Sequence, residues 1–148
     1  MKSTSLVEKQ QELTVSHVDK PWGYELIYGL SESYCGKILF VRAGASLSLQ
    51  YHRRKDETIY LQRGEAVIEL GTETGYTRAL EISAGATFHI PPGTVHRLRA
   101  KTDSTFLEVS TPHLDDVVRI EDAYGRTDDT LALEASWQTN SSRNGAAT

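Results

Sequence analysis

The chain has 148 residues, 39% of them hydrophobic and 24% charged, which is typical of one folded domain with its own core and argues against a disordered chain. Its formal net charge of -4 gives no attraction for phosphate backbones, so we expect no nucleic-acid partner. No window has the roughly 20 apolar residues that span a bilayer, the N-terminus lacks a secretory signal, and the single cysteine, Cys35, excludes an internal disulfide. We therefore expect a soluble, cytoplasmic protein with no membrane partner.

Short runs rich in β-branched and aromatic residues make up the middle of the chain, with glycine-containing turns between them. Residues 41–52 alternate between apolar and polar side chains, as a strand with one solvent-facing side requires. Arg63-Gly64 and residues 71–76 are expected to form hairpin turns. No window of helical length has a helical period. The nine predicted strands cover residues 24–28, 37–42, 46–52, 57–62, 65–70, 76–82, 87–90, 95–100 and 105–110.

This spacing predicts an all-β sandwich or closed barrel rather than a βαβ arrangement. We place the barrel domain at residues 15–126. Residues 1–14 are expected to form a flexible N-terminal segment and residues 127–148 a loosely ordered tail, because both are polar or small and weakly patterned.

Four residues in two of these segments have the spacing of a metal site. Gln50 and His52 are separated by one residue, so on a strand their side chains point to the same side. Glu57 follows at the start of the next strand, and a turn rich in proline and glycine leads to a strand that begins with His96. Two imidazoles, a carboxylate and an amide oxygen suit one divalent Zn, Mn, Fe, Co or Ni ion, and the absence of thiolates argues against a structural zinc. Any one of these residues alone is more often an ordinary packed or solvated side chain, but the four together favour a metal site.

Residues 44–64 (Gly, Gln-x-His, Glu, Gly) and 85–96 (Gly, Pro, Gly, His) resemble the two motifs of the cupin superfamily. The resemblance implies a double-stranded β-helix (jelly-roll) barrel with its metal inside. Gln50 stands where the common cupin pattern has a histidine, and an amide oxygen is a weaker donor than an imidazole.

A narrower resemblance covers about residues 20–126. The strings KPWGYELI, SLSLQYHRR, IPPGTVHRL and DDVVRIEDAYGR are similar to the cupin domain of type II mannose-6-phosphate isomerases, a family that also uses glutamine at the position of Gln50. In that family the domain commonly follows a sugar-nucleotide transferase domain. This chain has no room for one, so we do not expect it to synthesise nucleotide sugars.

The family chemistry implies an aldose-ketose isomerisation of a sugar phosphate through an enediol, stabilised by the metal. As the base we first consider Glu108, whose pKa burial would raise, and then Lys37. Arg126 and Arg97 are candidate phosphate ligands, although alternation turns Arg97 away from the interior if His96 points inward. The basic run 53–55 at the barrel mouth is an alternative phosphate clamp.

Two other functions remain open from the sequence. Two histidines and a carboxylate also suit an iron-dependent oxygenase, and a barrel of this kind could bind or sense carbohydrate without catalysis. We expect the partner to be a small sugar or sugar phosphate. We also expect a homodimer formed through edge strands.

Overall fold

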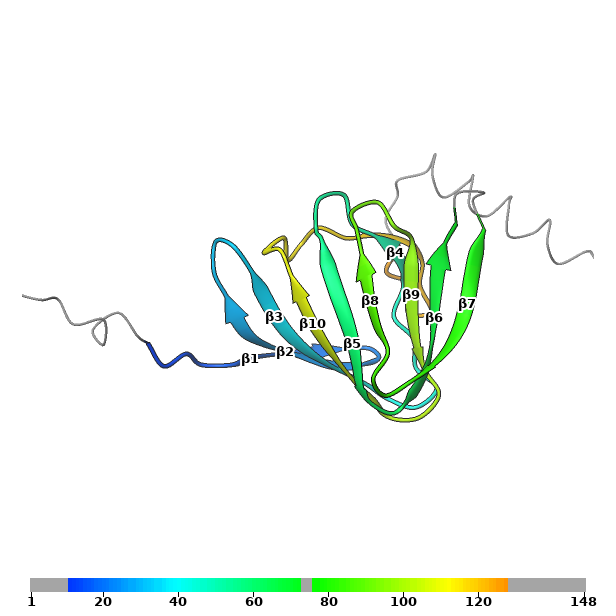
Figure 1. The fold of residues 1–148 in the computed structure, drawn as a ribbon, viewed down its shortest axis with the longest axis horizontal. Coiled ribbons are helices and arrows are strands. Elements are labelled where there is room, and N and C mark those ends of the chain that lie inside the picture. The colour runs from blue at the N-terminus through cyan, green and yellow to red at the C-terminus, as the bar shows by residue number, and fades with distance from the viewer. Residues whose placement is uncertain (1–10, 73–75, 128–148) are drawn as a thin grey trace, which may run out of the picture.

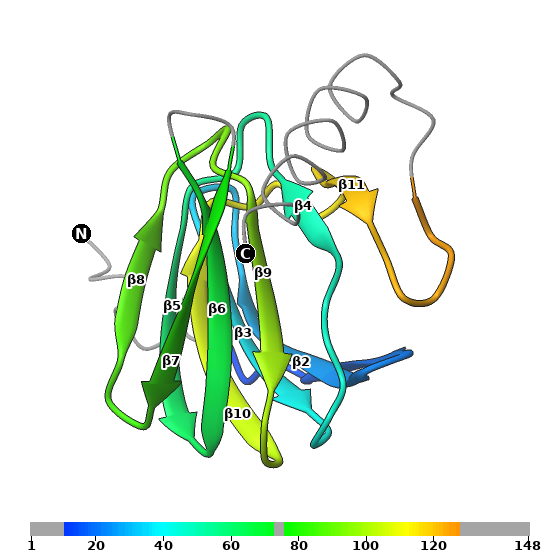
Figure 2. The same ribbon diagram turned by 90° about the vertical axis from the view of Figure 1, so that its right-hand side faces the viewer.

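The computed structural model describes residues 11–72 and 76–127. All regular elements in these residues are β-strands, and they form two antiparallel sheets that face each other (Figure 1). The first sheet has the order β1-β2-β3-β10-β5-β8, with β1 (Ser16–Lys20), β2 (Gly23–Leu30), β3 (Cys35–Val41), β10 (Ser104–Ser110), β5 (Glu57–Arg63) and β8 (Thr87–Ile90). The second has the order β11-β4-β9-β6-β7, with β11 (Val118–Glu121), β4 (Leu49–Tyr51), β9 (His96–Ala100), β6 (Glu65–Gly71) and β7 (Thr77–Ser83) (Figure 2). This confirms the predicted all-β fold.

An apolar core fills one end of the space between the sheets. Alternate residues of β5 point inward, and Ile59 and Leu61 are buried while Tyr60 between them is exposed, which is the period of two that a strand imposes. Residues from both sheets complete the core, namely Trp22, Leu39, Val41, Ala66, Ile68, Ile90, Leu98, Ala100 and Phe106. Burial of this apolar surface is the main favourable contribution to folding.

The alternating segment at residues 41–52 forms less strand than its pattern predicts. Residues 41–52 do not form one strand: β3 ends at Val41, the chain turns at Gly44 with a φ of 80°, and only Leu49–Tyr51 form β4. Apolar alternation is a property of the side chains, but a strand also needs neighbours for its backbone. Between β3 and β4 the backbone bonds to β9 through residues 44–47, around the isolated bridge of Ser46 to Arg99. Conversely, β1 and β11 were not predicted. β1 has a single β-branched residue, Val18, whereas β11 contains Val118 and Ile120, so its signal was present in the sequence.

Of the two expected hairpin turns, the structure confirms the one at residues 71–76 and contradicts the one at Arg63-Gly64. β6 and β7, which flank residues 71–76, pair antiparallel as expected. Arg63-Gly64 is not a hairpin turn, because β5 and β6 on either side of it belong to different sheets. Gly64 therefore lies at a corner where the chain crosses from one sheet to the other.

The expected terminal segments lie largely outside the described residues, which exclude 1–10 and 128–148. Residues 11–14 carry no regular structure and are exposed. Over the ranges 11–72 and 76–127 there is no helix with the length and hydropathy to cross a bilayer.

We expect Gly64→Ala to lower the free energy of unfolding by more than Gly85→Ala. Both glycines have a left-handed backbone, with φ of 101° and 102°, so each alanine incurs the same conformational strain of about 1–3 kcal/mol. A Cβ at Gly64 would also lie 2.6 Å from the carbonyl oxygen of Asp103 and 2.9 Å from Cα of Ser104, whereas at Gly85 nothing lies within 4 Å. Urea unfolding of the two variants measures the difference, and equal midpoints would contradict the packing at this corner.

Candidate metal centre

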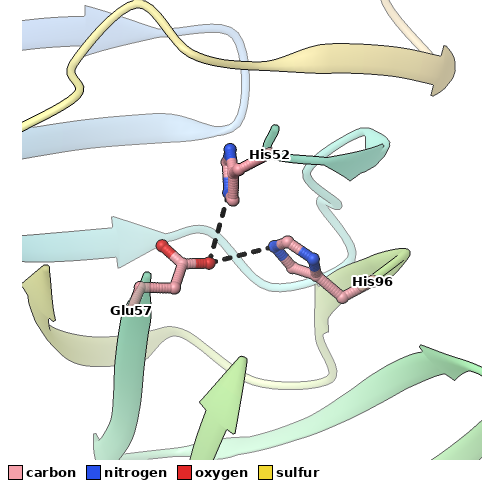
Figure 3. A group of neighbouring side chains, drawn as sticks. All are labelled: His52, Glu57 and His96. Carbon is pink, nitrogen blue, oxygen red and sulfur yellow. Dashed lines mark ion pairs between the residues drawn. The ribbon is translucent and has the colours of Figure 1, made fainter. Parts of the chain in front are cut away.

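Three ligand-type side chains from separate segments meet at one end of the barrel interior. His52 directly follows β4, Glu57 begins β5, and His96 begins β9 (Figure 3). One carboxylate oxygen of Glu57, Oε1, lies 3.3 Å from Nε2 of His52 and 3.1 Å from Nε2 of His96. All three residues are buried, and their ligand atoms lie within 4.8 Å of one another. This group could hold a metal ion.

Hydrogen bonds at Nδ1 orient the two imidazoles so that their Nε2 atoms point toward Glu57. Nδ1 of His52 lies 2.6 Å from the backbone carbonyl oxygen of Asp116, and Nδ1 of His96 lies 2.8 Å from that of Thr94. A carbonyl oxygen only accepts, so we assign the ring proton to Nδ1 in each case. Each Nε2 of the neutral ring then presents a lone pair, as in metal sites where a second partner orients the histidine.

These lone pairs face a third acceptor, the carboxylate of Glu57. Nε2 of His52 is buried without a hydrogen-bond partner among the described residues, and an unpaired buried polar atom costs about 1–3 kcal/mol. Protonating both rings would bury two more positive charges beside the ammonium of Lys55. A divalent cation satisfies all three acceptors, so the donor set fits the metal that the sequence predicts.

Lys55 compensates the negative charge of the site. Its Nζ lies 2.9 Å from Oε2 of Glu57, an ion pair that falls short of hydrogen-bond geometry, and 3.0 Å from Oε2 of Glu108. Burial by itself raises the pKa of Glu57, but the ammonium of Lys55, and hydrogen bonds from the imidazoles whenever their Nε2 atoms carry a proton, outweigh it and hold the pKa well below its usual range. Glu57 is therefore ionised at neutral pH, as a metal ligand must be.

Gln50 lies beside the group formed by His52, Glu57 and His96. It pairs directly with His96 across β4 and β9, so both side chains point to the same face of the sheet. Its Oε1 accepts a hydrogen bond of 2.7 Å from the hydroxyl of Ser48. Gln50 lines the same cavity as the other three residues, and its role as a fourth ligand stays a prediction.

The two candidate bases, Glu108 and Lys37, are also buried and line this cavity. They face each other across β10 and β3. Burial raises the pKa of Glu108, and the positive charge of Lys55 offsets only part of that rise. Nζ of Lys37 lies 3.4 Å from Oε1 of Glu25. Their catalytic roles stay predictions.

The basic run 53–55, expected at the barrel mouth as an alternative phosphate clamp, divides in the structure. Arg53 and Arg54 are exposed, whereas Lys55 is buried. The signal was available, because Lys55 precedes Glu57 by two residues and shares its inward side of the chain.

Asp116 and Glu25 were missed for a different reason. The carboxylate of Asp116 accepts hydrogen bonds from the backbone N–H groups of residues 53, 54 and 55, at 3.0, 2.6 and 2.8 Å. Asp116 thus fixes the loop between His52 and Glu57, while its carbonyl orients His52. Glu25 is buried beside Lys37. No local pattern links either residue to segments so distant in sequence.

The two candidate phosphate ligands line the cavity but differ in their partners. Arg97 binds Glu69 through Nε and Nη2, at 3.1 and 2.9 Å, and its Nη1 lies 3.4 Å from Glu121. Among the described residues, the only acidic side chain that pairs with Arg126 is that of Asp122. Their role in substrate binding stays a prediction.

The family described as "Mannose-6-phosphate isomerase C-terminal" matches residues 7–122. Xanthan biosynthesis protein XanB of Xanthomonas campestris is 33% identical over 115 residues, which cover 74% of this chain and 24% of XanB. Alginate biosynthesis protein AlgA of Pseudomonas putida is 31% identical over 130 residues, covering 83% of this chain and 26% of AlgA. The chain thus spans about a quarter of the length of these relatives.

Solved structures share the fold. KdgF from Halomonas sp. superposes with a TM-score of 0.56 at 25% identity, covering 68% of this chain and 90% of KdgF. Together with the two facing antiparallel sheets, this similarity agrees with the predicted cupin barrel.

Proposed function

Since the chain belongs to the mannose-6-phosphate isomerase C-terminal family, we propose that it is a metal-dependent isomerase that interconverts aldose and ketose sugar phosphates. The first substrates to test are mannose 6-phosphate and fructose 6-phosphate. Its relatives take part in xanthan and alginate biosynthesis by name, which is consistent with a sugar substrate.

One observation carries the proposal: a buried carboxylate lies next to the candidate metal ligands. A single ammonium, that of Lys55, bridges Glu57 and Glu108 at 2.9 and 3.0 Å. An isomerase needs a positive centre for the substrate oxygens and a base for the carbon-bound proton, and both lie on one cavity here.

In the proposed reaction Glu108 removes the proton from C2 of the open-chain aldose and returns it to C1 of the enediol. The hydroxyl proton of O2 passes to O1 in the same sequence, so the ketose forms with no net gain or loss of protons. Its raised pKa, which results first from burial, suits a group that must accept and release a proton near neutral pH. A divalent cation held by His52, Glu57 and His96 would supply positive charge for the negative charge that develops on the substrate oxygens. Lys37, opposite Glu108, would donate a hydrogen bond to these oxygens.

The test is an assay of metal-loaded protein with mannose 6-phosphate in deuterium oxide. We expect fructose 6-phosphate to form, and we expect NMR to show solvent exchange of the hydrogen at C2. If none of the five candidate metals gave conversion or exchange, the isomerase proposal would be refuted. Oxygen uptake by the Fe(II) form with a sugar substrate would instead favour the oxygenase alternative.

We expect Glu108→Gln to lower kcat by about 10²–10⁴-fold, the usual contribution of a general base. The amide is isosteric but cannot take the proton. Lys55 keeps its ion pair with Glu57 in this variant, so metal content should stay at the wild-type value. Steady-state kinetics combined with elemental analysis separates the two effects. An unchanged kcat would exclude Glu108 as the base and leave Lys37 as the next candidate.

A further inference from the structure

Among the described residues, the guanidinium of Arg126 is held on one edge, by Asp122. Oδ2 of Asp122 accepts hydrogen bonds from Nε and from the backbone N–H of Arg126, at 2.9 and 2.7 Å, and Oδ1 accepts one from Nη2 at 3.1 Å. The Asp122 side chain is fully buried, while that of Arg126 is 26% exposed. The carboxylate is therefore part of the protein framework, and the guanidinium reaches outward from it.

Among residues 11–72 and 76–127, no hydrogen bond to the other edge of Arg126 is present. A guanidinium has five N–H donors, and Asp122 uses two of them, which leaves three on Nη1 and Nη2. No described side chain takes these three, and Arg126 lines the cavity that contains His52, Glu57 and His96. Two parallel N–H groups on such an edge match two oxygens of a phosphoryl group.

Tyr124 gives the guanidinium a second support. The centre of the Arg126 guanidinium lies 5.6 Å from the centroid of the Tyr124 ring, within the range of a cation–π contact. Between these residues Gly125, with a φ of 73°, turns the chain back so that the N–H of Arg126 reaches Asp122. The position of the guanidinium is thus set by a backbone turn, a buried carboxylate and an aromatic ring.

Arg97 offers a contrast on the same cavity. Glu69 takes its Nε and Nη2, and Glu121 lies against its Nη1, so carboxylates meet both edges of this guanidinium. An anion at Arg97 would have to displace a carboxylate, whereas no carboxylate of the described part of the chain meets the second edge of Arg126. The two sequence candidates for phosphate binding are therefore not equivalent.

We propose that Asp122 and Tyr124 are positioning residues that hold Arg126 as a preformed clamp for a phosphoryl group, and that this clamp selects phosphorylated over neutral sugars. This inference rests on the proposed function for the choice of substrate. A clamp held in place before binding loses less side-chain entropy when the anion arrives, which strengthens binding. Arg97 instead stabilises the sheet through its contacts with the carboxylates of Glu69 and Glu121.

The experiment is calorimetric titration of inorganic phosphate into metal-loaded protein. We expect Arg126→Gln and Arg126→Lys to weaken phosphate binding by about tenfold or more, since lysine keeps the charge but loses the two-pronged contact. Asp122→Asn and Tyr124→Leu should weaken it by about three- to tenfold through loss of positioning. Lys101→Met is the control, because Lys101 follows the far end of β9 from His96, and it should change binding less than about twofold.

Asp122→Asn gives opposite results for positioning and for simple charge compensation. If Asp122 only neutralised Arg126, removing its charge would strengthen phosphate binding, so tighter binding would refute the positioning role. No phosphate binding by the wild type, or unchanged binding by Arg126→Gln, would refute the clamp. Near-UV circular dichroism and metal content verify that each variant is folded, and Tyr124→Leu keeps the test open if Asp122→Asn does not fold.

Kinetics separate the clamp from the isomerase. Phosphate binding that depends on Arg126, in a protein without turnover, would refute the proposed function and leave the clamp standing. Isomerase activity with the same KM for mannose 6-phosphate in Arg126→Gln would refute the clamp and leave the function standing. If the clamp and the proposed isomerase function are both correct, Arg126→Gln and Asp122→Asn raise KM for mannose 6-phosphate more than they lower kcat.

Discussion

Replacing Glu57 by glutamine is expected to abolish metal binding and, with it, isomerase activity. The variant keeps the shape of the side chain but removes the one negative charge that both imidazoles face. Loss of an outer contact already lowers metal affinity by about 10–100-fold in metalloproteins, and we expect a larger loss for a ligand. Elemental analysis after dialysis, together with competition against a chromogenic chelator, measures the change.

Glu65→Gln is the matched control for Glu57→Gln. Glu65 is the exposed first residue of β6, so its substitution changes the net charge by the same amount without altering the cavity. This control should retain wild-type metal content and activity. If Glu57→Gln also retained them, the metal would have to bind elsewhere, and the account of the centre would be wrong.

Replacing Lys55 by methionine is expected to destabilise the protein by about 3–5 kcal/mol, the usual cost of removing one partner from a buried ion pair. Without the ammonium, Glu57 and Glu108 would be two buried carboxylates lacking their shared counter-charge. A bound divalent cation beside Glu57 would compensate part of this loss. The destabilisation should therefore be larger in chelator-treated protein, and urea unfolding with and without metal measures both values.

Arg54→Met tests whether position rather than charge accounts for the Lys55 effect. Arg54 is the adjacent residue and its side chain is exposed, so we expect a change within about 0.5 kcal/mol. Adding Glu108→Gln to Lys55→Met should recover part of the lost stability, because it removes one of the two uncompensated charges. Equal destabilisation by Lys55→Met and Arg54→Met would contradict the buried ion pair.

The sequence predicts those parts of the site that depend on local geometry. His52 follows Gln50 on one side of β4, and the proline-glycine turn before β9 ends where His96 begins the strand. Strand alternation and turn chemistry act over a few residues, so they can be read from the sequence. The meeting of His52, Glu57 and His96 follows once the barrel closes.

Contacts between distant segments could not be predicted in this way. Asp116 fixes the loop around Lys55 from more than 60 residues away, and its own neighbours in sequence give no sign of this role. The same limit explains the misplaced strand at residues 41–52. Its apolar alternation is correct, but hydrogen-bonding neighbours, which decide where a strand exists, come from β9 and β11.

The inward faces of β3, β5 and β10 divide the barrel into two zones along its length. At one end Leu39, Phe106 and Leu61 lie in one row across the three strands, and at the other end Glu108 lies beside Lys37 while Ser110 lies beside Glu57. β3 and β10 thus carry packing residues in one half and an ionisable residue in the other, while in β5 the apolar Ile59, which pairs with Glu108, lies between Leu61 and Glu57. A change of reaction would need new side chains only in the ionisable half, so natural variation or laboratory evolution could redirect the chemistry of this barrel while its apolar half keeps the chain folded.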